Sequence, residues 1–188
     1  PPGRPRSDQR TGRDECGAVV DTFRGESLNK VDGKGRVSIP ALFRRVLDAC
    51  DPDRKPGDGS GIVLVYGDHR RKFIECYTVR EAHRIDRLIA RMKTGSPQRR
   101  ALERLIQGQS FPTQVDDDGR LVLPPVVRER LNLAPGGGEV YFVASGATFQ
   151  IWHPDAWAEE EAKLRDWLDE QPEDFDPLSL LPDEDEVE

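Results

Sequence analysis

The amino-acid sequence predicts a mainly β fold with short helices (α+β), built from two tandem halves. An internal repeat predicts the halves, because residues 31–47 align with residues 115–131 without a gap, at a constant offset of 84. Hydrophobic patterning predicts the strands, since each copy contains short alternating or apolar runs bounded by turn residues. A unit of roughly 55 residues with four short strands and one helix buries little apolar surface alone. We therefore expect the two copies to complete each other's core.

Each copy begins with a β-hairpin, whose tight turn leads into a strand and then a short helix. In the first copy the Asp32 side chain bonds the turn backbone, and Gly35 accepts positive φ. Pro40 ends the strand 36–39 and suits the first turn of a helix. The apolar stripe of this helix consists of Leu42, Phe43, Val46 and Leu47. The residues of this structural motif in both copies are Asp32, Gly35, Pro40, Asp116, Gly119, Arg120, Pro124 and Arg128.

A second strand pair completes each copy. These strands are predicted at 62–66 with 72–77 in the first copy, and at 139–144 with 148–152 in the second. Here residues 74–77 align with residues 149–152 at an offset of 75, so the first copy holds nine extra residues. We place all nine in the turn-rich loop 51–61.

The remaining segments divide the chain into five parts. Gly95-Ser96-Pro97 is expected to break the helical connector between the repeats, whose many arginines are more typical of a solvated face than of a binding surface. Leu164, Trp167 and Leu168 indicate a short acidic helix, followed by disorder from Gln171. The parts are a disordered N-terminal extension (1–20), the first repeat (21–82), the connector (83–107), the second repeat (108–157) and the acidic helix with its disordered tail (158–188).

The charge of the chain is unevenly distributed. The net charge of −7 combines a segment 155–188, with 15 acidic and 2 basic residues, and a remainder with 20 acidic and 26 basic residues. A mildly basic body of this kind is compatible with nucleic-acid binding. The acidic tail is either a solvating terminus or a segment that competes with DNA for the basic face. No apolar run is long enough to span a membrane, and three cysteines without C-x-x-C spacing suit a reducing, cytoplasmic location.

The sequence contains no pattern that indicates catalysis. The H-E-x-x-H and G-x-S-x-G signatures are absent, and Gly33-Lys34-Gly35 lacks the glycine spacing of a P-loop. His69, His83 and His153 are scattered, and neither repeat shares them with the other. We therefore expect a protein that is not an enzyme, with no catalytic residue, no cofactor and no metal site.

With both repeats in view, the sequence resembles the MraZ family, whose members contain two SpoVT-AbrB (AbrB-like) repeats. The resemblance begins at Phe23-Arg24-Gly25-Glu26, continues through DGKGRVSIP (32–40) and its second copy, and ends at Phe149-Gln150-Ile151-Trp152 followed by Trp157. It covers about residues 23–160. The chain departs from the family pattern in its N-terminal extension, its enlarged first loop, its acidic tail, and Ala82 in place of the usual Trp.

The resemblance implies both an architecture and a function. It implies two swapped-hairpin halves that form a pseudo-dimeric barrel, assembled into a ring homo-oligomer, an octamer or a dodecamer. The expected partner is double-stranded DNA, at direct repeats in the promoter of the division and cell-wall gene cluster that includes the protein's own gene. The resemblance further implies transcription regulation, usually repression, and a location in the cytoplasm in association with the nucleoid.

The first turn is the expected DNA-binding element. Its basic neighbours contrast with the second turn, where Asp116-Asp117-Asp118 repels phosphate. Arg36 is the leading candidate, because an arginine on a hairpin can bond guanine in a bidentate manner or hold a phosphate. Asp32 with Arg36, and Asp116 with Arg120, are expected to form ion pairs that stiffen the turns. The predicted DNA-binding residues are Arg36, Lys34, Arg24, Lys30, Arg44 and Arg45, the last two in the following helix.

Two other functions fit parts of the sequence. AbrB-like hairpins also occur in antitoxins, and Phe175, Leu178, Leu180 and Leu181 in the tail would suit a segment that wraps a toxin. Against this reading, antitoxins usually carry one copy and dimerise. A ring-forming scaffold whose partner is a protein is the other alternative, which a footprint on the protein's own promoter would distinguish.

Overall fold

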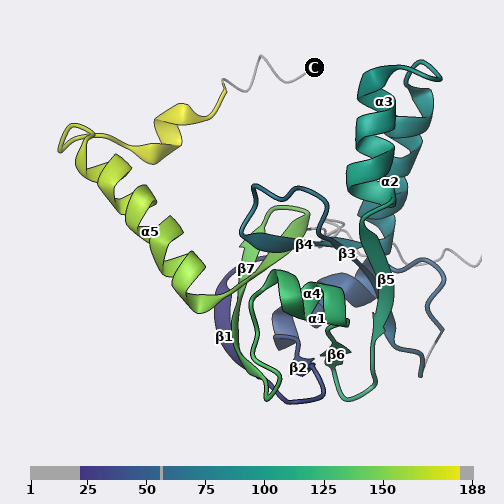
Figure 1. The fold of residues 1–188 in the computed structure, drawn as a ribbon. Helices are drawn as coiled ribbons and strands as arrows, with labels where there is room; N and C mark the ends of the chain where they lie inside the picture. Colours follow the sequence, from purple (N-terminus) through teal and green to yellow (C-terminus); the bar gives the residue numbers. More distant parts are fainter. Residues whose placement is uncertain (1–21, 56, 183–188) are drawn as a thin grey trace, which may run out of the picture.

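The computed structural model describes residues 22–55 and 57–182 and contains one eight-stranded antiparallel sheet that nearly closes into a barrel (Figure 1). The strand order is β5-β3-β4-β8-β7-β1-β2-β6, and β5 contacts β6, so the two edges of the sheet meet. The first half contains β1 (Glu26–Val31), β2 (Arg36–Ser38), α1 (Ala41–Ala49), β3 (Ser60–Val65) and β4 (Phe73–Thr78). The second half contains β5 (Ser110–Val115), β6 (Arg120–Val122), α4 (Pro125–Arg130), β7 (Gly138–Ser145) and β8 (Thr148–Trp152). The predicted mainly β fold with short helices is confirmed.

The two halves exchange strands. The first strand of each half pairs with the third strand of the other half, β1 with β7 and β5 with β3. The pairs β2·β6 and β4·β8 also join the halves, and in them equivalent residues lie opposite each other: Val37 opposite Leu121, and Glu75 opposite Gln150. A pseudo-twofold axis therefore passes through both pairs, as expected for a pseudo-dimeric barrel.

Apolar side chains from both halves fill the barrel. The ring of Phe23 lies 5.3 Å from that of Phe43 and 5.0 Å from that of Phe149, and Phe142 completes the aromatic cluster. Each such ring removes a large apolar area from water, so this cluster contributes much of the barrel's stability. Because Phe43 comes from the first half and Phe142 and Phe149 from the second, neither half has a complete core alone.

The predicted helix stripe is wrong at one position. Phe43, Val46 and Leu47 of α1 are buried, whereas Leu42 is exposed, and so is Val126 at the equivalent position of α4. A two-turn helix on the outside of a barrel buries one face, and the spacing of residues 43, 46, 47 and 50 defines that face. Leu42 lies about 100° around the helix from Phe43, on the solvent side.

The nine extra residues of the first copy do not all lie in one loop. Val65 pairs with Glu75 as Val143 pairs with Gln150, so the offset between copies is already 78 at β3 and becomes 75 at β4. Six extra residues therefore lie between α1 and β3, and three lengthen the loop 66–72 between β3 and β4. Placing all nine in 51–61 was wrong, because the turn-rich composition of that loop concealed the second, shorter insertion.

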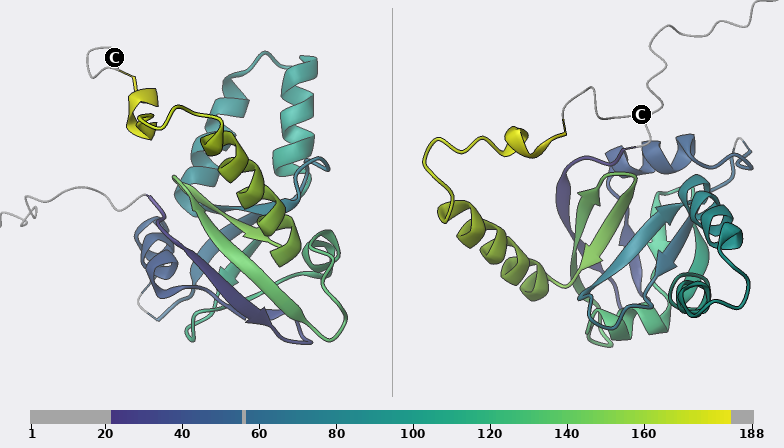
Figure 2. Two further views of the ribbon diagram at one scale, coloured as in Figure 1. Left: turned by 90° about the vertical axis from the view of Figure 1, so that its left-hand side faces the viewer. Right: turned by 90° about the horizontal axis from the view of Figure 1, so that it is seen from above.

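The connector forms a helical hairpin that projects from the barrel (Figures 1 and 2). Its elements are α2 (Val79–Arg91), α3 (Pro97–Leu102) and a π-helical turn, η1 (Glu103–Gln107). The break falls where Gly95-Ser96-Pro97 predicts it: Gly95 has φ 77°, and the Ser96 hydroxyl accepts a hydrogen bond from the Arg99 backbone N–H. The connector arginines are partly neutralised within the hairpin, as Arg84 pairs with Glu81 and Arg99 with Glu103.

The acidic helix α5 (Pro154–Asp169) leaves the barrel on the other side of the same end (Figures 1 and 2). Beyond it, where disorder was expected from Gln171, the described chain continues to Pro182 and includes a 3-10 helix, η2 (Pro177–Leu180), capped by Asp176. The ring of Phe175 packs edge-on against Trp167 at 5.8 Å, which accounts for part of this order. None of the described helices is long and apolar enough to cross a membrane. The expected N-terminal extension (1–20) lies outside the described residues.

Candidate nucleic-acid interface

The two Asp-x-x-Gly-Arg turns lie at one end of the barrel, on either side of the β2·β6 ribbon (Figure 1). The antiparallel register places Arg36 opposite Val122 and Ser38 opposite Arg120, so each turn ends beside the last residue of the partner strand. The backbone N–H of Ile39 donates to the Gly119 carbonyl, and that of Leu123 donates to the Gly35 carbonyl. Each turn is thus held by the strand of the opposite half.

Asp32 holds the first turn in a fixed shape. Its Oδ1 accepts hydrogen bonds from the backbone N–H groups of Lys34 (2.8 Å) and Arg36 (2.9 Å), while Oδ2 accepts from Nε of Arg36 at 2.7 Å. The backbone and then the side-chain hydrogen bond of Arg36 lower the pKa of Asp32, because both favour its charged form. The Arg36 side chain remains 48% exposed. The predicted Asp32–Arg36 ion pair is present, and it orients a guanidinium that solvent can reach.

The second turn uses a different ion pair from the one predicted. Asp116 accepts a hydrogen bond from the Arg120 backbone N–H at 2.7 Å, but the Arg120 guanidinium pairs with Asp118 at 2.8 Å. Asp118 occupies the position that Lys34 has in the first copy, so the second turn offers Arg120 a carboxylate that the first turn lacks. The expected Asp116–Arg120 side-chain pair is therefore wrong, for a reason visible in the turn sequences.

Arg24 does not join the other predicted basic residues. Residues near it bond the β7–β8 turn, since the Phe23 N–H donates to the Gly146 carbonyl and the Ala144 N–H to the Gly25 carbonyl. The whole of β1 separates this point from the first turn, a length of about 20 Å for six extended residues. Lys30 and Lys34 are exposed at the turn end of β1. The structure thus brings Lys30, Lys34 and Arg36 together and leaves Arg24 at the far end of the strand.

Arg44 and Arg45 lie beside the acidic second turn, not the basic first one. Together with Asp116 and Asp117 they line a recess of about 310 Å³ between α1 and that turn. Arg44 packs across Gly119: a Cβ at Gly119 would lie 2.6 Å from Cδ and 2.7 Å from Cζ of Arg44. Their predicted place in the DNA-binding set finds no support in this position, because the neighbouring carboxylates repel phosphate.

Arg128 of the second half occupies the equivalent place against the first turn. A Cβ at Gly35 would lie 3.0 Å from Cδ and 3.2 Å from Nε of Arg128. The repeat alignment identifies Arg128 as the counterpart of Arg44, but the alignment alone cannot show that each helix packs on the turn of the other half. The residue that sequence reasoning left out of the basic site is therefore Arg128.

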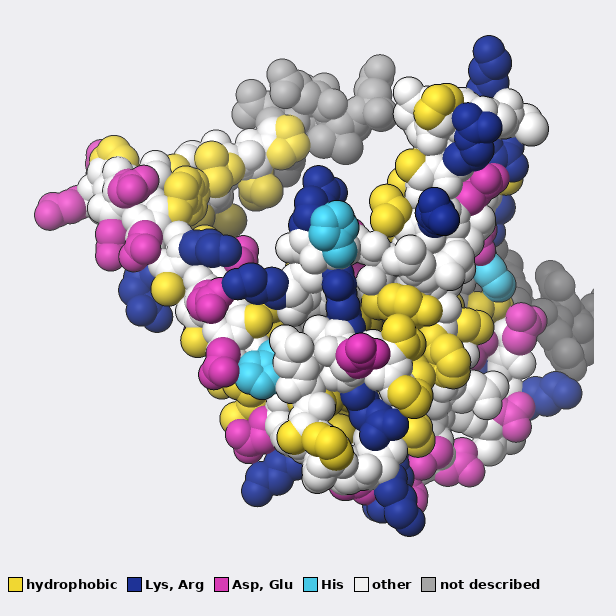
Figure 3. Space-filling model, viewed as in Figure 1, with side chains coloured by type: hydrophobic (Ala, Val, Ile, Leu, Met, Phe, Trp, Pro, Cys, Tyr) yellow, Lys and Arg dark blue, Asp and Glu magenta, His cyan; other side chains and the backbone are white. Residues whose placement is uncertain are grey.

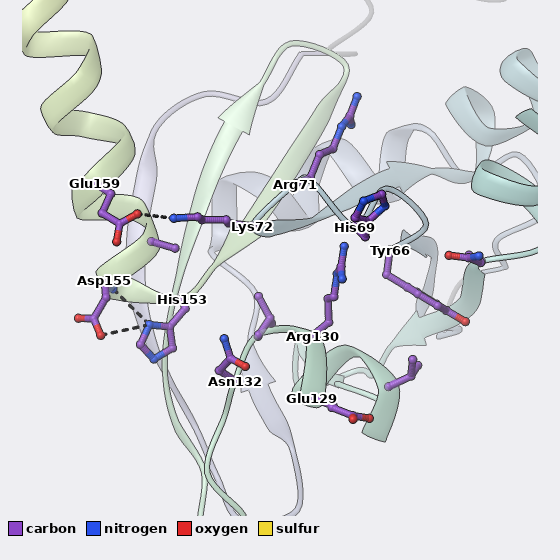
Figure 4. A pocket seen from close by; sticks show the side chains of 14 residues that line it. Tyr66, His69, Arg71, Lys72, Glu129, Arg130, Asn132, His153, Asp155 and Glu159 are labelled. Atoms are coloured by element: carbon purple, nitrogen blue, oxygen red, sulfur yellow. Dashed lines mark hydrogen bonds and ion pairs between the residues drawn. The ribbon is translucent and has the colours of Figure 1, made fainter. Parts of the chain in front are cut away.

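A larger recess lies elsewhere, between the β3–β4 loop, α4 and the start of α5 (Figure 4). Its volume is about 850 Å³, and Arg71, Lys72 and Arg130 line it together with Glu129 and Glu159. Lys72 forms an ion pair with Glu159, and acidic and basic side chains are interleaved on this face (Figure 3). Among the described residues no group of three His, Cys, Asp or Glu side chains converges as a metal site would require.

The exchanged hairpin halves and the paired turns define the fold class of the protein, a pseudo-dimeric barrel of the AbrB-like type. The chain is 54% identical over 160 residues to the transcriptional regulator MraZ of Ruegeria pomeroyi, covering 85% of this chain and 94% of that protein. It is 45% identical over 167 residues to MraZ of Cereibacter sphaeroides (87% and 97%) and 38% identical over 139 residues to MraZ of Parvibaculum lavamentivorans (74% and 80%). No family model matches the chain. The chain belongs to the MraZ family of transcriptional regulators, and as expected it is not an enzyme.

Proposed function

We propose that this protein represses the promoter of a division and cell-wall gene cluster that includes its own gene, by binding direct repeats in double-stranded DNA as a ring homo-oligomer. The observation that supports the DNA contact is the solvent-accessible Arg36 guanidinium on a turn that Asp32 holds through three hydrogen bonds. Such a side chain reaches the DNA already oriented, so binding costs little conformational entropy. The proposed location is the cytoplasm, in association with the nucleoid.

Within this site, Arg36 reads the DNA and the lysines add charge. Asp32 engages Nε of Arg36, so the Nη atoms make the contact with a guanine edge or a phosphate. Lys34 and Lys30 are exposed beside it and supply the phosphate contacts that make affinity depend on salt. Arg24 and Arg45 are not part of this set in our proposal, since one lies at the far end of β1 and the other beside the acidic turn.

Self-association, as an octamer or a dodecamer, would compensate for the small size of each site. One turn per subunit offers few contacts, but several turns held at fixed spacing bind repeated DNA boxes more tightly through effective concentration. The uncovered apolar side chains Leu164, Trp167 and Leu168 on α5 support a protein–protein contact at that helix.

A gel-shift titration tests this proposal with DNA from upstream of the protein's own gene. We expect the full array of boxes to bind at least about tenfold more tightly than a single box. We also expect affinity for the array to fall steeply between 50 and 200 mM salt, by roughly three orders of magnitude for six phosphate contacts. Equal affinity for one box and for the array would contradict the ring-based mechanism. A footprint that protects no repeat would contradict the DNA site itself.

A further inference from the structure

The Arg128 side chain packs against the first turn, and no described carboxylate pairs with it there. Its Cδ and Nε lie against Gly35, and Nε is buried without a hydrogen-bond acceptor. Among the described residues no ion pair joins Arg128 to a carboxylate. The neighbouring backbone is fixed as well, because the Leu123 N–H donates to the Gly35 carbonyl at 2.8 Å. A positive charge with no ion-pair partner among the described residues thus packs against Gly35, the residue between Lys34 and Arg36.

The equivalent site in the second turn, related by the pseudo-twofold axis, provides a comparison. Arg44 packs against Gly119 in the same way, and its Nε is also buried without an acceptor. The surroundings differ in charge. Arg128 joins a turn with one carboxylate, Asp32, whereas Arg44 joins a turn with three, Asp116, Asp117 and Asp118. The two arginines therefore share a structural role, but Arg128 joins a turn with a net positive charge and Arg44 joins a turn with a net negative charge.

We propose that Arg128 is a positioning residue of the DNA site, so that each site is composite and contains residues of both halves. Its side chain holds the first turn in the shape that presents Arg36. Its uncompensated charge adds to the attraction for the phosphate backbone, which makes binding depend on salt. Arg44 does the same structural work for the second turn without contributing to DNA binding. This inference rests on the proposed role of the first turn.

Paired substitutions separate the two roles. Arg128→Met keeps the length of the side chain and removes its charge, and Arg44→Met is the matched control. With DNA from upstream of the protein's own gene, we expect Arg128→Met to weaken binding by roughly five- to tenfold and to lower the slope of log affinity against log salt by about one. Arg44→Met should leave both the affinity and the slope unchanged.

A second pair of variants controls for the possibility that the Met variants fail to fold. Arg128→Lys and Arg44→Lys retain the charge, and Arg128→Lys should restore the salt slope of the wild-type protein. Equal effects of the two Met variants on DNA binding, or an unchanged slope for both Arg128 variants, would overturn the inference and leave a structural role only. Arg36→Ala distinguishes this failure from that of the proposed function. If Arg36→Ala also binds normally, the first turn is not the DNA site.

Discussion

At the scale of single residues, equivalent positions of the two repeats perform different tasks. Arg36 and Arg120 occupy the same place, yet Arg36 pairs with Asp32 and Arg120 with Asp118, because position 34 is Lys and position 118 is Asp. The sequence could predict this asymmetry of charge, because three consecutive acidic residues form the second turn. It could not predict which basic residues lie together in space. Arg24 and Lys34 are close in sequence, but the extended strand β1 lies between them and keeps them apart.

Substitution of Arg36 tests the contact with DNA. Arg36→Ala should abolish footprinting of the repeats, because it removes the exposed guanidinium and leaves every backbone hydrogen bond of the turn in place. The pair with Asp32 is on the surface, so the free energy of unfolding should fall by only about 0 to 1 kcal/mol. Sizing chromatography should show an unchanged oligomer. Arg120→Ala is the matched control and should retain the footprint. A normal footprint for Arg36→Ala would exclude this residue from the site.

Substitution of Gly35 tests the close packing under the turn. Gly35 has φ 81°, and a Cβ there would lie 2.9 Å from the Leu123 carbonyl oxygen. Gly35→Ala should therefore lower the free energy of unfolding by at least about 1 to 2 kcal/mol, from backbone strain and from displacement of the opposing strand. Gly136→Ala is the control, since a Cβ at Gly136 would meet nothing within 4 Å. Denaturant titration measures both, and equal stability of the two variants would disprove the argument.

At the scale of elements, the repeat predicts the local structure of each copy but not which strands of the two halves pair with each other. The turn, strand and helix of each copy follow from nearby residues such as Gly35 and Pro40, and they appear as expected. The partner of each strand does not follow, because β1 could satisfy its backbone on either half and the pairing with β7 is a long-range choice. The same exchange explains why Arg128 was missed. Its helix follows the second turn in sequence but packs on the first turn in space.

The exchange also explains how one site comes to contain both halves. Leu123 and Arg128 of the second half fix Gly35 of the first, and Ile39 and Arg44 of the first half fix Gly119 of the second. Each turn thus packs against residues of the other half, in addition to the hydrogen bonds that it makes within itself. A substitution in α4 therefore acts on the DNA site of the first turn, which no assignment of function to separate repeats would predict.

At the scale of the whole molecule, charge and apolar surface lie on projecting parts. The first turns of the acidic helix α5 contact the barrel. There the ring centroids of Trp157 and Trp152 lie 5.6 Å apart, and Glu159 pairs with Lys72. Further along, α5 and the segment after it expose apolar side chains to solvent. The α2–α3 hairpin projects separately, with exposed Leu88 and Leu102 among its arginines (Figure 1). An acidic apolar helix and a basic apolar hairpin are complementary surfaces on copies of one chain.

This complementarity predicts that α5 of one copy docks on the α2–α3 hairpin of another. The double variant Leu164→Gln/Trp167→Gln removes the apolar face of α5, and analytical ultracentrifugation should show it shifted to smaller species. Trp167 is 41% exposed and also loses its ring contact with Phe175, so the free energy of unfolding should fall by no more than about 1 kcal/mol. Glu161→Gln/Arg165→Gln, which leaves the net charge and the apolar face intact, should assemble normally. Because the separated subunits keep the first turn, their affinity for a single DNA box should be preserved while the gain from repeated boxes is lost. An unchanged assembly of the Leu164/Trp167 variant would exclude α5 from the interface.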